Sequence, residues 1–270
     1  MNDLQQTEFK MLKCFVEICN KLNLKYYLVC GTALGAVKYG GFIPWDDDVD
    51  VALPREDYEI FCKEAQRLLP KEYFLQTYKT DKAYPSIFAK IRNSNTTYIE
   101  KTIAKLPINH GVYIDVFPLD GYPEDKKSQI KIEIKKKYYD LLLSSVRESN
   151  CSFKVKVLRK IFRLFGVHKR TAKILAKFEK LISVYPTKNS KIWCNHGNWQ
   201  GKLEYSPQKQ YGEGVLMNFE GFEVKVPENF DEYLTQKYGN WQADLPEEEK
   251  FGHHYYSVMD LKKSYTEYVK

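Results

Sequence analysis

"GFIPWDDDVDV", residues 41–51, crowds Asp46, Asp47, Asp48 and Asp50 into one short stretch. Like charges this close repel one another, and a carboxylate is not buried unpaired without a large cost in free energy. The stretch therefore predicts either an acidic turn in solvent or a site built to hold a divalent cation. The residues around it favour the cation site.

A strand is predicted at residues 47–53, which begins within this stretch and extends past it. Val49 and Val51 alternate with Asp48 and Asp50, so a strand would turn the apolar side chains to one face and the carboxylates to the other. Positions two apart on a strand are about 6.6 Å apart. Both carboxylates are therefore expected to reach a single ion.

A second predicted strand, residues 111–121, also carries an acid among apolar residues. Asp115 shares a face with Tyr113 and Phe117. A carboxylate inside an apolar strand suggests metal or proton chemistry, with a buried ion pair as the plain alternative. Asp120 lies near the end of the same strand and is a competing candidate for the third acid.

Gly31 and Thr32 follow a third predicted strand, residues 26–30. Small residues after a strand let the backbone approach a phosphate, and Thr32 is expected to cap the helix that follows. Together with the acid-bearing strands, this layout is the one that metal-assisted phosphoryl transfer needs. Mg²⁺ suits it, because this ion prefers hard oxygen ligands and keeps waters and substrate phosphates around it.

The remaining sequence predicts an α+β protein, in which a mixed sheet is flanked by helices. Helical spacing of apolar residues marks residues 4–22 and 55–69. The further predicted strands are residues 73–78, 85–92, 96–100 and 222–227, and a short helix is expected at 230–238.

Composition places the chain among globular proteins. It has 270 residues, of which 43% are hydrophobic and 15% aromatic. We find no apolar run of about 18 residues, the length that a membrane span needs. The first residues, MNDLQQTEFK, do not resemble a signal peptide, and the cysteines form no CxxC pair. These features predict a cytoplasmic protein.

The net charge of +7 is unevenly distributed. Residues 126–180 hold 17 Lys and Arg against 4 Asp and Glu, or +13, so the rest of the chain carries −6. We expect a catalytic core at residues 1–125, a basic helical segment at 126–185, and a C-terminal α/β portion at 186–270 that completes the domain. The basic segment suggests contact with an anionic membrane surface or an anionic acceptor. Nucleic acid is not expected, because no recognised module accompanies the charge.

The chain resembles a known family at several motifs. These are GTALGAVKYGGFIPWDDDVDV (31–51), IDVFPLDGYP (114–123), FEGFEVKVP (219–227), YGNWQADLPEEEK (238–250) and the paired histidines at 253–254. Their identity and order are similar to those of the LicD family of phosphotransferases, which includes fukutin and fukutin-related protein. The motifs span most of the chain, although the middle helical part is only loosely similar.

The resemblance implies a nucleotidyltransferase-like fold. It also implies transfer of a substituted phosphate from a CDP-activated donor to a sugar hydroxyl, with release of CMP. Choline, ribitol and glycerol are the donor alcohols known in the family, and bacterial acceptors include teichoic acids, capsules and lipopolysaccharide. Mg²⁺, with Mn²⁺ as a second candidate, would lie on Asp48 and Asp50 with help from Asp46. Asp115 stands at the position of the third acid, and Asp120 is the alternative.

Further substrate contacts are expected from basic side chains and from the histidine pair. Lys38, Lys90 and Arg92 are candidates for holding phosphate or the leaving CMP, although ordinary solvated charges are an equally good interpretation. His253 and His254 are candidates because they fall in a family motif.

Other functions remain open. The same fold could transfer a nucleoside monophosphate from a nucleoside triphosphate, which would release pyrophosphate. A DxD glycosyltransferase fits less well, because a nucleotide-binding half of about 100 residues normally precedes the DxD. A non-enzymatic, membrane-associated scaffold is the remaining alternative. The expected location is the cytoplasm, with peripheral attachment to the inner face of the membrane.

Overall fold

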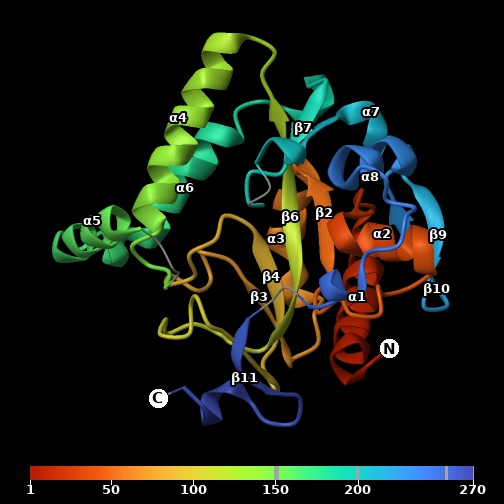
Figure 1. Cartoon of the computed structure of the whole chain (residues 1–270), viewed down its shortest axis with the longest axis horizontal. Coiled ribbons are helices and arrows are strands. Elements are labelled where there is room, and N and C mark those ends of the chain that lie inside the picture. The colour runs from red at the N-terminus through yellow and green to blue at the C-terminus, as the bar shows by residue number, and fades with distance from the viewer. Residues whose placement is uncertain (149–151, 199–200, 253–254, 270) are drawn as a thin grey trace.

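The computed structural model describes residues 1–148, 152–198, 201–252 and 255–269. Helices flank a central mixed sheet, and both ends of the described chain lie toward the same end of the molecule (Figure 1). The expected α+β fold class is confirmed.

The sheet is built from strands that are far apart in the sequence. The described strands are β1 (Tyr27–Leu28), β2 (Asp50–Pro54), β3 (Tyr73–Gln76), β4 (Ala89–Asn93), β5 (Thr97–Glu100), β6 (Val112–Tyr122), β7 (Ile192–Cys194), β8 (Tyr205–Pro207), β9 (Val215–Phe219), β10 (Phe222–Val226) and β11 (Tyr256–Asp260). The main sheet has the order β1-β2-β6-β4-β3, and β7 and β8 continue it from β6. β2 and β6 are parallel, whereas β6 and β4 are antiparallel.

Helices cover the sheet on both sides. The described α-helices are α1 (Asp3–Leu22), α2 (Cys30–Tyr39), α3 (Arg55–Glu64), α4 (Lys126–Leu143), α5 (Phe153–Leu164), α6 (Thr171–Ile182), α7 (Gln208–Tyr211) and α8 (Phe230–Tyr238). In Figure 1, α4 and α6 lie side by side on one flank of the sheet, whereas α1, α2 and α8 lie on the other.

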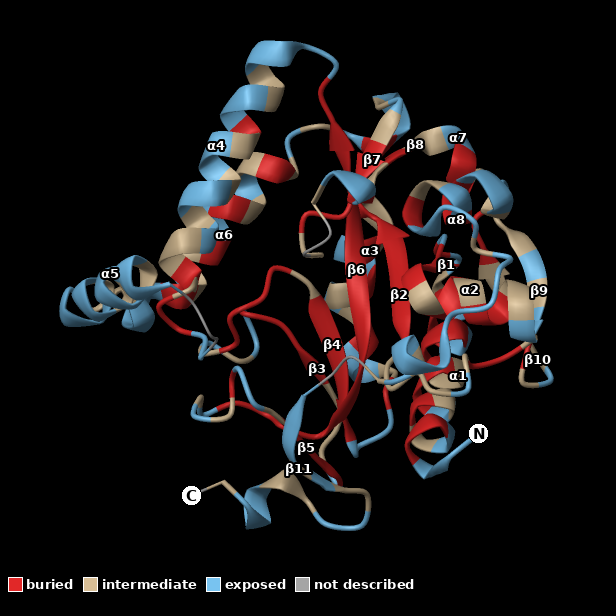
Figure 2. Cartoon of the chain, viewed as in Figure 1, coloured by how far each residue is buried: buried red, intermediate tan, exposed pale blue. Residues whose placement is uncertain are grey.

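β6 is the central strand, and it is buried along its whole length (Figure 2). It pairs with β2 on one edge and with β4 on the other, and α1 and α3 also pack against it. A strand enclosed in this way carries apolar residues on both faces. Asp115 and Asp120 are therefore carboxylates held in the interior.

α1 forms because apolar residues recur at helical spacing and its first turn is capped. Asn2 and Gln5 make a capping box, in which each side chain accepts a hydrogen bond from the other's backbone N–H. The amide of Gln5 then donates to the carbonyls of Ile43 and Asp46, at 3.2 and 3.0 Å. The start of α1 thereby ties down the loop that carries the acidic stretch.

Two local expectations at this loop were wrong. α2 begins at Cys30 with Val29 at its N-cap, so Thr32 lies inside the first turn and does not cap the helix. β2 begins at Asp50, so Asp48 belongs to the preceding loop and does not share a strand face with Asp50. The loop leaves Asp48 partly exposed, which costs less than burying it inside the sheet.

The other expected elements are present with shifted ends. α3 ends at Glu64 and gives way to a 3₁₀ turn, Ala65–Arg67, and β4 begins at Ala89 where the strand was expected from residue 85. β7, β8, β9 and β11 were not predicted.

The segment from α4 to α6 builds a second apolar cluster, which includes Leu143, Phe178 and Ile182. α5 projects from this cluster and has no buried residue (Figures 1 and 2). The division into units at residues 125 and 185 stays a prediction. In the described part of the chain, the helices all lack the length or the apolar character needed to cross a bilayer.

His196 lies in this second region, fully enclosed among aromatic rings. Its ring centroid is 6.3 Å from that of Tyr122, 6.3 Å from that of Phe178 and 6.2 Å from that of Tyr205. Burial, reinforced by Lys136, lowers the pKa of His196 from 6.5 to about 3. The folded protein therefore holds this imidazole neutral where the unfolded chain would protonate it.

This difference predicts acid sensitivity. The contribution of His196 to stability is complete above pH 6.5 and is lost as the pH falls towards 3, by about 1.4 kcal/mol per pH unit. Between pH 7.5 and 5, wild type should lose about 2 kcal/mol of unfolding free energy relative to His196→Gln. Urea-induced unfolding at both pH values measures this loss of unfolding free energy. Exposed His168, changed to Gln, is the matched control, and equal pH slopes for wild type and His196→Gln would contradict the prediction.

Candidate active site

A cavity of about 680 Å³ opens where the acidic loop meets the sheet, and we call it the acidic pocket. Its acidic lining residues are Asp46, Asp48, Asp50, Glu100 and Asp115, and Lys90 also lines it. These residues come from the loop before β2, from β2 itself, and from β5, β6 and β4. The fold thus gathers carboxylates from distant parts of the sequence into one cavity.

Asp50, Asp115 and Lys90 form a row across three neighbouring strands. Asp50 pairs with Asp115 in the parallel β2–β6 ladder, and Asp115 pairs with Lys90 in the antiparallel β6–β4 ladder. Residues opposite each other in a ladder turn their side chains to the same face, about 5 Å apart. The Lys90 Nζ lies 2.7 Å from the Asp115 Oδ1. Two acids and one base therefore stand side by side at the cavity wall.

A second group of carboxylates stands on the loop. Asp46, Asp47 and Asp48 bring one oxygen each to within 4.8 Å of one another. Gly31 explains how the loop comes so close to α2, since a Cβ at this position would stand 3.0 Å from the Asp46 Oδ2. Any larger residue at position 31 would press on that carboxylate.

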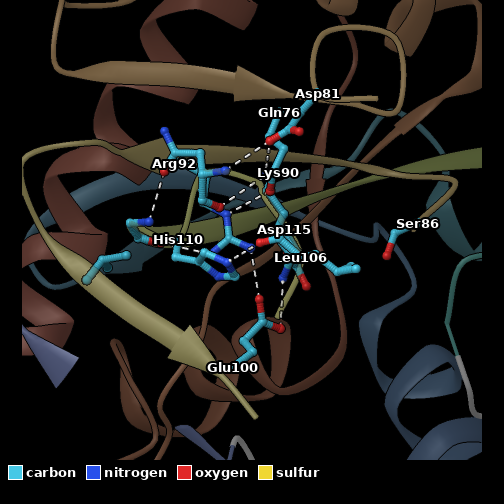
Figure 3. Close-up of polar contacts among 12 residues, drawn as sticks. Gln76, Asp81, Ser86, Lys90, Arg92, Glu100, Leu106, His110 and Asp115 are labelled. Atoms are coloured by element: carbon cyan, nitrogen blue, oxygen red, sulfur yellow. Dashed lines mark hydrogen bonds and ion pairs between the residues drawn. The ribbon is translucent and has the colours of Figure 1, made fainter. Parts of the chain in front are cut away.

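Lys90 is an enclosed cation, with 4% of its surface exposed. Its Nζ lies 3.7 Å from the Glu100 Oε1 and 3.2 Å from the centre of the Tyr113 ring. Arg92, on the same face of β4, is fully buried and binds the other oxygen of Glu100 at 2.8 Å (Figure 3). Arg92 therefore holds Glu100 at the pocket rim.

The hydroxyl of Thr32 also has a structural partner. Its Oγ1 accepts the backbone N–H of Asp50 at 2.8 Å, which sets the start of β2 next to α2. Lys38 donates instead to the carbonyls of Gln242 and Ala243, at 3.0 and 2.7 Å, and lies 3.1 Å from Asp244. Thr32, Lys38 and Arg92 are absent from the described lining of the acidic pocket.

Asp120 is placed away from the acidic pocket. It is completely buried, and its two carboxylate oxygens accept hydrogen bonds from the Nε and Nη2 of Arg55 at 2.6 and 2.8 Å. Of the two candidates for the third acid, Asp115 lines the cavity and Asp120 is held by a buried ion pair. His253 and His254 lie outside the described residues.

Burial makes it unfavourable to keep carboxylates charged in and next to the acidic pocket. It raises the pKa of Asp115, and the charge of Lys90 acts against that rise. Glu8 of α1 is also buried, and burial followed by the charges of Asp48, Asp46 and Asp47 raises its pKa well above the usual value. Sequence reasoning missed Glu8, because it sits on an ordinary helical repeat.

The chemistry of the donor set fits a hard divalent cation. Carboxylate oxygens are the ligands that Mg²⁺ and Mn²⁺ prefer, and those of Asp46, Asp47 and Asp48 converge within reach of one ion. A cation there would also offset the mutual repulsion that raises the pKa of Glu8. The pocket can thus accept a metal and an anionic substrate together.

Cys30 lines the acidic pocket and has a strained backbone. Its φ is +53°, in the left-handed region that disfavours side chains other than glycine, and its N–H donates to the hydroxyl of Tyr233 at 3.1 Å. Strain of this kind gathers at functional sites. Glu100, Arg147 and Asn198 also line the cavity and lie in none of the quoted family motifs. Tyr238 lines it too and begins the motif at 238–250, although it was not predicted as a site residue.

Comparison with known proteins is consistent with this geometry. Residues 23–142 match the family described as "LicD/FKTN/FKRP, nucleotidyltransferase domain". A lipopolysaccharide cholinephosphotransferase LicD of Haemophilus influenzae is 27% identical over 259 residues, which cover 94% of this chain and 96% of that protein. An uncharacterized protein of Rickettsia prowazekii is 34% identical over 117 residues, covering 43% of this chain and 40% of that protein.

Proposed function

We propose, from the match of residues 23–142 to the LicD/FKTN/FKRP nucleotidyltransferase domain, that the protein transfers a substituted phosphate to a sugar hydroxyl of a cell-surface glycan. The donor is a CDP-activated alcohol, and CMP is the second product. The cholinephosphotransferase named for the Haemophilus relative makes phosphocholine the first group to try, with glycerol phosphate next.

The observation that carries this proposal is the row of Asp50, Asp115 and Lys90 beside the acidic loop. A diphosphate is strongly anionic, so a cavity of carboxylates can accept it only together with cations. Lys90 is one cation already in place. The carboxylates of Asp46, Asp47 and Asp48 would hold the other, Mg²⁺ or Mn²⁺, and Asp50 lines the same cavity. When bound, the ion would offset negative charge on the transferring phosphate.

In the proposed reaction, Asp115 accepts the proton of the acceptor hydroxyl. Burial raises its pKa, which makes it a stronger base than an exposed aspartate, while Lys90 keeps it oriented at 2.7 Å. The acceptor hydroxyl loses its proton to Asp115 and its oxygen bonds to phosphorus. The bond from phosphorus to the CMP oxygen breaks, and CMP leaves with that electron pair.

CMP release tests the function directly. The full chain is incubated with Mg²⁺, an acceptor glycan and one of CDP-choline, CDP-glycerol, CDP-ribitol or CDP-ethanolamine. We expect CMP and a phosphate-decorated glycan with one donor, and loss of both products when EDTA is added. Release of pyrophosphate from a nucleoside triphosphate would instead identify a nucleotidyltransferase, and no product with any donor would refute transfer.

Membrane attachment stays a proposal that rests on α5. Phe153, Leu164 and Phe165 at its ends are 81%, 86% and 74% exposed, among many basic residues of the 126–180 segment. Exposed apolar side chains next to basic ones are typical of helices that lie on anionic bilayers. Peripheral attachment of a cytoplasmic enzyme would place it close to a lipid-linked glycan acceptor.

A further inference from the structure

A second cavity, of about 730 Å³, adjoins the acidic pocket and has the opposite charge. We call it the basic pocket. Its charged lining residues are Lys101, Arg147, Lys156, Arg159, Lys160 and Arg163, with Glu148 as the acid among the described lining residues. Thr102, Arg147 and Tyr255 line both cavities, so the two lie next to each other and share part of their walls. A ligand bound in one therefore lies close to the other.

One face of α5 supplies most of this charge. Lys156, Arg159, Lys160 and Arg163 are spaced i, i+3, i+4 and i+7, which places them on a single side of the helix. Like charges at this spacing destabilise a helix by a few tenths of a kcal/mol per pair. This face of α5 lines the cavity, where an anionic ligand would offset the repulsion.

Two of the guanidinium groups are held in position by the protein. Arg147 donates from Nη2 to the Pro85 carbonyl and the Ser86 hydroxyl, at 2.9 and 3.0 Å, and Ser86 itself lines the acidic pocket. Arg163 donates from Nε to the Ser145 carbonyl at 2.8 Å. A guanidinium has five N–H donors, so each group keeps donors for a ligand after these bonds are made.

The acid in the lining does little to neutralise the cavity. Glu148 lies 2.9 Å from the Nζ of Lys105, a residue outside the basic pocket. Lys105 therefore partly neutralises the charge of Glu148. Less of that negative charge remains to offset the lysines and arginines that line the basic pocket. The basic pocket keeps a surplus of positive charge, which repels metal ions and attracts phosphates or carboxylates.

We propose that the basic pocket binds anionic groups, phosphate or carboxylate, on the glycan acceptor and so directs its hydroxyl into the acidic pocket. This inference rests on the proposed function. The donor diphosphate is assigned to the carboxylates of the acidic pocket, so the basic pocket remains for the other substrate. A cavity of about 730 Å³ has room for several sugar units.

Binding experiments test the inference without turnover. The full chain is titrated calorimetrically with a phosphorylated, a carboxylated and a neutral oligosaccharide of equal length, with inorganic phosphate, and with vesicles of anionic phospholipid. We expect an anionic oligosaccharide to bind at least about 10-fold more tightly than the neutral one, since one charge-assisted contact contributes about 1.4 kcal/mol or more. Binding should weaken as salt is raised.

Paired variants locate the site. Lys156→Gln combined with Lys160→Gln should weaken the anionic oligosaccharide about 10-fold or more and raise the acceptor KM similarly, with the donor KM unchanged. Lys154→Gln combined with Lys169→Gln removes the same charge from neighbouring positions outside the described lining, and should change neither value. Equal losses in both pairs would overturn the inference.

Other outcomes also decide against it. Equal affinity for charged and neutral oligosaccharides would show that the pocket does not select anions. Inorganic phosphate binding as tightly as the oligosaccharides would assign the pocket to free phosphate, and binding to vesicles alone would assign it to a membrane. Absence of CMP release together with selective oligosaccharide binding would refute the proposed reaction but leave this site standing.

Discussion

Asp50→Asn is expected to lower kcat by about 10²–10³-fold, or about 3–4 kcal/mol of transition-state stabilisation, with little effect on folding. The substitution removes one negative charge beside Asp115 and keeps the size of the side chain. The backbone N–H of Asp50 still donates to Thr32, so the start of β2 should be retained. CMP release with the active donor measures kcat, and thermal unfolding measures the effect on folding.

Asp3→Asn is the matched control for this variant. Asp3 is exposed in the first turn of α1 and is absent from the described lining of the acidic pocket, so its loss should leave kcat unchanged. If Asp50→Asn retained kcat to within about threefold while Mg²⁺ was still required, the row of charged residues would not be part of the catalytic site.

Asp120→Asn is expected to act on stability. The change removes the two short contacts of Arg55 and leaves the buried guanidinium with Glu179 alone, at 3.4 Å. Breaking a buried ion pair from one side costs about 3–5 kcal/mol. The unfolding free energy from urea titration should fall by that amount. Enzyme that remains folded should turn over at nearly the normal kcat, because Asp120 does not line the acidic pocket.

Glu124→Gln is the control variant for Asp120→Asn. Glu124 lies 2.9 Å from Lys191, but their side chains are 61% and 77% exposed. Exposed pairs contribute about 0–1 kcal/mol, so this variant should unfold almost as wild type does. A result in which Asp120→Asn kept its stability and lost kcat would return Asp120 to the chemistry and remove Asp115 from its proposed place.

Asp115 and Asp120 show what could not be predicted from the sequence. Both lie on one strand, and alternation along that strand cannot tell a carboxylate that faces a cavity from one that faces an arginine. Asp115 meets Asp50 and Lys90 because β6 lies between β2 and β4. Asp120 meets Arg55, the first residue of α3, because that helix packs back on β6.

Sequence patterns were sufficient to predict the features that depend only on residues close together in the sequence. The spacing of apolar residues predicted α1, and the apolar residues around Asp115 predicted β6. The crowded aspartates predicted a cation site, and the structure brings the carboxylates of Asp46, Asp47 and Asp48 close together. Helix periodicity, strand alternation and like-charge repulsion act over a few residues, so the printed sequence contains them.

Which charged residues lie next to one another is determined only by the tertiary structure. The register of β2 against β6 joins residues more than sixty positions apart, and β4 adds Lys90 to the same row. The packing of α5 makes its basic face part of a cavity wall. Such pairings follow from how apolar faces pack in three dimensions, which is a balance over the whole core. The acidic loop is a property of the amino-acid sequence, whereas the opposed charges of its two adjoining cavities are a property of the fold.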